Sequence, residues 1–193
     1  EPGATAAAIL IAAEDLLARY GEEGLSIREL CAQVGVTPPT IYHHFGDKQT
    51  LVDRIVDDCF AEFDGAFDDP GHPDDPVAAL GWMFERYVAY GAAHPAHYRL
   101  IFQRAHVSQT PAGLASFARL RRTLARIAAA GRLRTAVDDA TAACWAAAHG
   151  VTALVVAGFL PADSVAATLV REAIQTHLTT SVRNPRRTPR RSN

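Results

Sequence analysis

Apolar side chains recur every three or four residues through almost all of this 193-residue chain, and glycine or proline separates one such stretch from the next. This spacing places apolar residues on one face of an α-helix, whereas a half-buried strand would need strict alternation, which no segment shows convincingly. With 49% apolar residues, the chain is long enough to bury a substantial core. The pattern predicts an all-α fold of about nine helices.

Helix start and stop signals divide the chain further. Ser26 and Glu29 fit a capping box, Thr37 and Asp47 are further N-cap candidates, and a first helix is expected to end at Gly21. The segment 68–76 is rich in helix breakers and is interpreted as an exposed hinge. The helices expected after the first are 26–34, 37–45, 47–67, 76–93, 95–104, 111–130, 138–159 and 163–182.

Overall charge does not indicate a nucleic-acid partner. The formal net charge is −2, and residues 1–67 hold twelve acidic side chains against four basic ones. Five arginines lie between Arg183 and Arg191, in a segment rich in Arg and Pro, so residues 183–193 are predicted to be a disordered basic tail. Any prediction of DNA binding therefore depends on local residues.

Cysteine use and hydropathy bear on the compartment. Cys31, Cys59 and Cys144 show no pairing pattern, which argues against a disulfide framework and favours a reducing compartment. No basic segment followed by an apolar run opens the chain, and a cytoplasmic location is expected. Residues 140–162 lack charged side chains over a membrane-spanning length, but they are rich in Ala. A buried helix that packs closely on another helix is favoured, and no membrane association is expected.

Two short helices, 26–34 and 37–45, are joined by a tight turn at Gly35-Val36, as in a helix-turn-helix motif. The residues expected to face inward and lock the pair are Ile27, Leu30, Val34, Val36, Ile41 and Phe45. Those expected outward or partly outward are Pro38, Pro39, Thr40, His43 and His44. The outward side chains are short or form hydrogen bonds, so the backbone can approach base edges in a major groove.

Residues 25–56 resemble the TetR family of bacterial repressors. The residues that carry the resemblance are Val36-Thr37, Thr40-Ile41-Tyr42, His44-Phe45, Lys48 and Leu51. The resemblance implies a three-helix DNA-binding domain, residues 1–48, with residues 38–43 facing bases and with Ser26, Tyr42, His44 and Lys48 on phosphates. The complete predicted DNA-binding set is Ser26, Thr37, Pro38, Pro39, Thr40, Tyr42, His43, His44 and Lys48.

The rest of the chain carries a weaker resemblance. Trp145, His149 and Gly150 are similar to the Trp-His-Gly signature of one TetR C-terminal subclass. The family resemblance implies that residues 49–182 form a helical ligand-binding and dimerisation domain. It also implies a homodimer through residues 138–182, whose last two long helices would pair with those of a second subunit. The function implied is that of a repressor that leaves a palindromic operator when a small effector binds.

A small-molecule pocket is expected between the helices after the hinge. Tyrosine and tryptophan can offer a polar group inside an apolar cavity, which suits an apolar or aromatic effector. The predicted ligand-binding residues are Trp82, Tyr87, Tyr98, Phe102, Phe117, Trp145 and His149. Taken singly, each is more readily explained as an ordinary core residue.

Three alternatives remain beside this interpretation. An enzyme is disfavoured, because the chain has no GxSxG, HExxH or phosphate-loop motif. A DNA-binding protein without an effector stays open. A metal at His94, His97 and His106 is not expected, since no cysteine or carboxylate stands at ligand spacing beside them. Adjacent helical residues diverge by about 100°, so His43 and His44 cannot easily share one ion either. No cofactor is expected.

Overall fold

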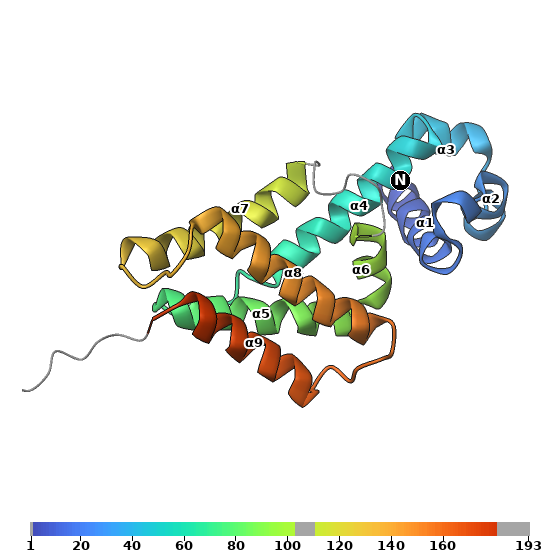
Figure 1. Cartoon of the computed structure of the whole chain (residues 1–193). Helices are drawn as coiled ribbons and strands as arrows, with labels where there is room; N and C mark the ends of the chain where they lie inside the picture. Colours follow the sequence, from blue (N-terminus) through green and yellow to red (C-terminus); the bar gives the residue numbers. More distant parts are fainter. Residues whose placement is uncertain (1, 103–110, 181–193) are drawn as a thin grey trace, which may run out of the picture.

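The computed structural model describes residues 2–102 and 111–180, and this part of the chain is all-α (Figure 1). Its nine helices are α1 Pro2–Gly24, α2 Ile27–Val34, α3 Pro38–Phe45, α4 Lys48–Gly65, α5 Pro76–Ala93, α6 Pro95–Phe102, α7 Pro111–Ala129, α8 Val137–Val156 and α9 Val165–Leu178. The predicted fold class is confirmed. The basic tail predicted at 183–193 lies outside the described residues.

Local sequence explains where the helices begin. The Ser26 hydroxyl accepts a hydrogen bond from the Glu29 amide at 3.3 Å, and the Asp47 carboxylate accepts one from the Thr50 amide at 2.7 Å. Thr37 holds the N-cap position of α3, but the prediction that its side chain would cap the helix is wrong. Its hydroxyl lies 3.1 Å from the hydroxyl of Thr40 and is used in that contact.

Glycines in the left-handed conformation set several ends. Gly21 has φ 70° and ψ −178°, which are not helical, so the regular first helix is interrupted there, as predicted, and a short helical segment follows to Gly24. Gly35, with φ 77°, ends α2 and makes the turn to α3. Gly158, with φ 76°, follows the end of α8, which is therefore shorter than the expected 138–159.

The helices form two packed groups that share α4. Helices α1, α2 and α3 lie together at one end of the molecule, and α4 runs from them into the bundle of α5, α7, α8 and α9 (Figure 1). Helix α6 packs on α1, α4 and α5. Fully buried side chains such as Leu16, Ile41, Leu51 and Ile101 belong to one continuous core that joins the two groups.

Helix α8 contains most of the uncharged stretch, residues 140–162, that has the length of a membrane span. By length and composition Val137–Val156 could cross a membrane, with a mean hydropathy of 1.2. In the structure it packs against α5, α7 and α9 and buries Ala140, Cys144, Ala148 and Val151. A core helix passes the same test of length and composition, so that test alone does not indicate a membrane span. The packing against three other helices favours a core helix.

Candidate DNA-binding surface and ligand cavity

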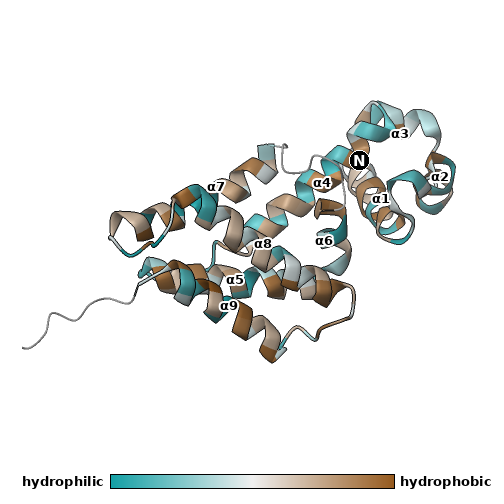
Figure 2. Ribbon diagram, viewed as in Figure 1, coloured by the Kyte–Doolittle hydropathy of each residue, from teal (hydrophilic) through white to brown (hydrophobic). Residues whose placement is uncertain are grey.

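Helices α2 and α3 form the helix-turn-helix that the sequence predicts. Leu30 and Ile41 are fully buried, and Ile27, Val34, Val36 and Phe45 pack against the same core. These contacts fix α3 on α1, α2 and α4. The opposite face of α3 is left to the solvent, and Figure 2 shows hydrophilic residues interspersed with hydrophobic ones along α2 and α3.

All nine predicted DNA-contacting residues are at least partly accessible to solvent. Thr37, Pro38, Pro39, Tyr42 and His43 are exposed, while Ser26, Thr40, His44 and Lys48 are half-buried.

The polar atoms on this surface are oriented by local hydrogen bonds. The Thr40 hydroxyl is held by Thr37, and the Ser26 hydroxyl accepts the Glu29 amide while keeping its own proton free to donate. The hydrogen bond from the Thr50 amide lowers the pKa of Asp47 below its ordinary value, so this cap stays ionised beside Lys48. The contacts of the nine residues with DNA remain predictions.

A cavity of about 300 Å³ lies between α4, α5, α7, α8 and α9. Its wall is mostly aromatic and aliphatic, with Ser116, Arg119, Arg171 and Gln175 as the main polar side chains. The lining residues are Phe60, Phe63, Phe67, Leu80, Met83, Phe84, Tyr87, Phe102, Gly113, Leu114, Ser116, Phe117, Arg119, Leu120, Cys144, Trp145, Ala148, Arg171, Ile174 and Gln175. Apolar walls with few polar groups are typical of small-molecule sites.

Four of the seven predicted ligand residues line this cavity: Tyr87, Phe102, Phe117 and Trp145. Trp82 lines neither cavity of the described chain. It packs on Phe67 and His72 instead, with the Arg86 guanidinium 5.2 Å from its ring centroid.

Tyr98 and His149 line a second, smaller cavity of about 200 Å³, to which Phe102 also contributes. The Tyr98 hydroxyl lies 2.7 Å from His149 Nδ1 and the Tyr87 hydroxyl 3.3 Å from the same atom. Trp145 stacks on the His149 ring at 5.1 Å. Burial lowers the pKa of His149 and raises the pKa of Tyr98 and Tyr87, so these groups are uncharged at neutral pH. Tyr87 lines the main cavity and its hydroxyl contacts His149 of the second cavity, so this side chain connects the two.

Sequence reasoning missed two walls of the main cavity. Phe60 and Phe63 belong to the apolar stripe of α4, and Phe67 follows the end of that helix at Gly65, which is earlier than the expected end at 67. The stripe indicates burial but not that the buried face borders a cavity. Arg171 and Gln175 come from α9, where they hydrogen-bond to each other at 3.0 Å. Nothing in the periodicity distinguishes these residues from others on the helix.

The structure changes the case for a metal. Glu62 of α4 lies beside His94 and His97, so a carboxylate that is remote in sequence is a neighbour in the fold. The stated reason for excluding a metal at these two histidines is therefore wrong. His106 lies outside the described residues.

Sequence profiles of two related domains match the chain. The profile of bacterial regulatory proteins of the tetR family matches residues 9–55. That of the tetracyclin repressor-like C-terminal domain matches residues 80–177, which is half of the chain.

Curated relatives agree over the N-terminal region. The chain is 39% identical over 54 residues to the class A tetracycline repressor protein from transposon 1721 of Escherichia coli, a match that covers 28% of this chain and 25% of that protein. It is 44% identical over 52 residues to an HTH-type transcriptional repressor of Mycobacterium tuberculosis, covering 27% and 28% respectively. The matches thus span about a quarter of each relative.

Solved structures agree over nearly the whole chain. A TetR family protein of Vibrio parahaemolyticus superposes with a TM-score of 0.72 at 22% identity, covering 92% of this chain and 99% of the other. This likeness shows the shared fold. Taken with the two profile matches, it shows that this chain belongs to the TetR family of bacterial transcriptional regulators.

Proposed function

We propose that this regulator is a homodimeric repressor that α3 places on a palindromic operator and that an apolar or aromatic effector releases. The observation that carries the proposal is the wall of the main cavity. Phe60 and Phe63 line it, and they belong to α4, the same helix that begins at Lys48 on the DNA-binding surface. A ligand in the cavity therefore touches a helix that also carries a proposed phosphate contact.

The proposed DNA contacts divide by chemistry. Tyr42, His44, Lys48 and Ser26 contact phosphates, which position the domain without reading sequence. Pro38, Pro39, Thr40 and His43 face base edges in the major groove, where short side chains let the backbone of α3 approach.

The cavity lining favours an effector that is mostly apolar, with one polar or acidic group. Each helix from α4 to α8 contributes at least one aromatic ring to the wall, and aliphatic side chains form much of the rest. The Arg171 guanidinium is a cation at its edge, although it already pairs with Glu85 at 3.2 Å. A ligand acid would compete with Glu85 for that cation, whereas an apolar ring fills the remaining space.

The proposed dimer uses residues 138–182. Large apolar side chains at the end of α8, in the following connection and on α9 are exposed: Leu154, Phe159, Val165 and Leu169. Figure 2 shows hydrophobic residues along both helices. Exposed apolar groups gathered in one region favour a protein interface. A two-fold dimer would present its two α3 helices to successive major grooves about 34 Å apart.

The TetR family consists of DNA-binding regulators, which removes the enzyme alternative. We also infer a cytoplasmic location, which suits a protein that acts on DNA. The Trp145, His149 and Gly150 signature supports assignment to the Trp-His-Gly subclass, through the stacking of Trp145 on His149. A regulator without an effector is the remaining alternative.

A ligand screen separates these two functions. An operator is first selected from random duplexes, and small aromatic acids and neutral aromatics are then titrated by calorimetry with and without saturating operator. Because allosteric coupling is reciprocal, an effector should bind about 5 to 150-fold more weakly to the operator complex. Phe117→Ala, which alters the cavity wall, should weaken binding, whereas the aromatic control Tyr20→Ala, at an exposed position on α1, should not. If no bound compound loses affinity in the presence of operator, the effector proposal fails.

A further inference from the structure

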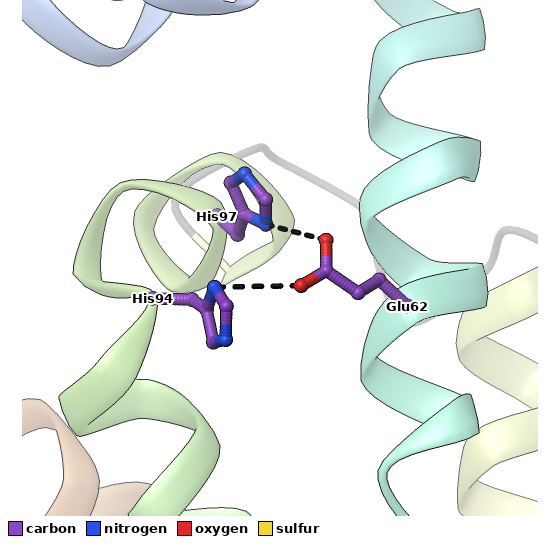
Figure 3. A group of neighbouring side chains, drawn as sticks. All are labelled: Glu62, His94 and His97. Atoms are coloured by element: carbon purple, nitrogen blue, oxygen red, sulfur yellow. Dashed lines mark ion pairs between the residues drawn. The ribbon is translucent and has the colours of Figure 1, made fainter.

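Three side chains with metal-ligating atoms meet outside the two cavities and away from the outer face of α3 (Figure 3). Glu62 projects from α4 toward His94, at the junction of α5 and α6, and toward His97, in the first turn of α6. Glu62 Oε1 lies 3.4 Å from His94 Nδ1, and Oε2 lies 3.1 Å from His97 Nδ1. The three ligand atoms lie within 4.8 Å of one another.

The surroundings of His97 favour a shared cation. Its Nε2 lies 2.5 Å from Glu14 Oε1 on α1, and its Nδ1 faces Glu62. A neutral imidazole carries one N–H group, so when Nε2 donates to Glu14, Nδ1 presents a lone pair. That lone pair then faces a carboxylate oxygen, and two acceptors at this separation attract only through a proton or another cation between them. Tyr90, whose hydroxyl lies 3.3 Å from Nδ1, is uncharged and does not supply that charge.

A second imidazole points to a metal ion in preference to a single proton. A proton on His97 would satisfy one side of Glu62, but His94 Nδ1 converges on the other oxygen of the same carboxylate. Two imidazole nitrogens and one carboxylate are a common ligand set for zinc. We propose that Glu62, His94 and His97 form a binding site for a divalent transition metal of the zinc class.

The distances suit that ion. Bonds of about 2.0 to 2.1 Å in a tetrahedral site place neighbouring ligand atoms about 3.3 Å apart. Each histidine is already close to this distance from one oxygen of Glu62, but the two contacts use different oxygens. Binding through one oxygen therefore requires the carboxylate to rotate and the two histidine rings to approach each other. Pro95 lies between the histidines in sequence and fixes its own φ, which restricts the backbone that carries them. Glu62 and His94 are partly exposed, so water can occupy the fourth position.

Glu14 acts as a positioning residue for this site. Its carboxylate accepts from His97 Nε2 and leaves Nδ1 free for the metal, an arrangement that commonly supports metal-bound histidine. Because Glu14 lies on α1 and Glu62 on α4, a bound ion would connect the DNA-binding end of the molecule to the α5–α6 junction.

Calorimetric titration of the full chain, freed of metal by chelator, with ZnCl₂ tests the site. We expect one zinc ion per chain, and His94→Ala and Glu62→Gln should each weaken binding by more than about 100-fold, since each removes a ligand. His177→Ala, on the exposed face of α9, is the control and should leave the affinity unchanged. Absence of saturable binding, or unchanged affinity in both ligand variants, would overturn the proposal.

Two further measurements separate loss of a ligand from loss of folding. Glu62→Gln conserves the side-chain shape. If circular dichroism shows that His94→Ala is unfolded, the zinc affinity of Glu62→Gln alone tests the site. Glu14→Ala should keep the stoichiometry at one but weaken zinc binding by about 10 to 100-fold. Substitution by Co²⁺ should give the visible absorption of a tetrahedral nitrogen and oxygen site, and this absorption should be absent in Glu62→Gln. An octahedral Co²⁺ spectrum in the wild-type chain counts against the assigned ligand set.

Discussion

The side chains proposed to hold DNA divide into two kinds at the scale of single residues. Lys48 brings a charge to the first turn of α4, whereas Thr40 brings a hydroxyl that Thr37 already orients. A charge acts on every phosphate alike, and an oriented hydroxyl distinguishes one base edge from another.

Substitution of these two residues should therefore give different results. Lys48→Ala is expected to weaken binding to specific and scrambled duplexes equally and to lower the slope of log affinity against log salt by about one unit. Thr40→Ala should keep that slope and relax preference at one base-pair position. Fluorescence anisotropy between about 50 and 200 mM salt measures both quantities. A Lys48→Ala variant with altered base preference and an unchanged slope would contradict the assignment.

His149 should make stability depend on pH. Its pKa is lowered by burial from the ordinary value of 6.5, so the folded chain holds this ring neutral where the unfolded chain protonates it. The free energy of unfolding should thus fall as pH decreases below about 6.5. His149→Gln removes this titration, and urea unfolding between about pH 7 and 5.5 should show a shallower decline than in the wild type. Parallel declines would show that His149 does not contribute.

Individual residues also show what the sequence could and could not predict about the sites. The outward face of α3 follows from helical periodicity alone, because Thr37 to Phe45 are contiguous. Glu62 and His97 are 35 positions apart in the sequence, and only the packing of α4 against α6 makes them neighbours. Trp82 and Tyr87 are both aromatic residues of α5, but they project in different directions, and composition cannot distinguish them.

At the scale of elements, the approach of α5 to α8 depends on the absence of a side chain. A Cβ atom at Gly91 would lie 2.2 Å from Thr152 Cγ2 and 3.3 Å from the Tyr98 ring. Thr152 is fully buried, and its hydroxyl donates to the Ala148 carbonyl at 2.8 Å, which holds its rotamer. The Thr152 methyl group therefore cannot move away from an added Cβ atom without breaking this hydrogen bond or displacing its neighbours.

We expect Gly91→Ala to lower the free energy of unfolding by about 1 to 3 kcal/mol, the usual cost of overpacking. Gly65→Ala is the matched control, because a Cβ atom there meets nothing within 4 Å. It should be neutral or stabilising by up to about 1 kcal/mol, as alanine is the better helix former. Urea unfolding at one protein concentration gives both values, and equal stabilities would refute the close-packing argument.

Helix ends were predictable where one residue decides them. Asp47 caps α4 and Gly35 ends α2, and both follow from the chemistry of those residues alone. The start of α9 was less predictable, because Asp163 and Ser164 are both good caps; the Ser164 hydroxyl accepts the Ala167 amide at 3.3 Å. At Thr37 the hydroxyl contacts the Thr40 hydroxyl instead of capping α3, and the sequence pattern of an N-cap does not predict this competing hydrogen bond.

At the scale of the whole molecule, the proposed dimer depends on apolar residues that the single chain leaves in solvent. Phe159 and Leu169 are 78% and 60% exposed. Burial of each would contribute about 1.5 to 3 kcal/mol to association.

The double variant Phe159→Glu, Leu169→Glu should raise the dimer dissociation constant by about 100-fold or more, because it loses this burial and places charges in the interface. Ile11→Glu is the control, since Ile11 is equally exposed, at 70%, but lies on α1. Sedimentation velocity at micromolar concentration distinguishes dimer from monomer. Ile11→Glu should remain dimeric. If Phe159→Glu, Leu169→Glu also remains dimeric, the interface lies elsewhere.

The continuity of α4 converts small angles into large displacements. Phe63 borders the cavity and lies 15 residues after Lys48 on the same helix, which corresponds to about 22 Å at 1.5 Å per residue. If a ligand tilts this rod by about 5° around Phe63, Lys48 moves by roughly 2 Å. A hydrogen bond to phosphate tolerates only a few tenths of an ångström before it weakens. In the proposed mechanism, an effector would therefore detach the protein from its operator while leaving the three-helix DNA-binding domain internally rigid.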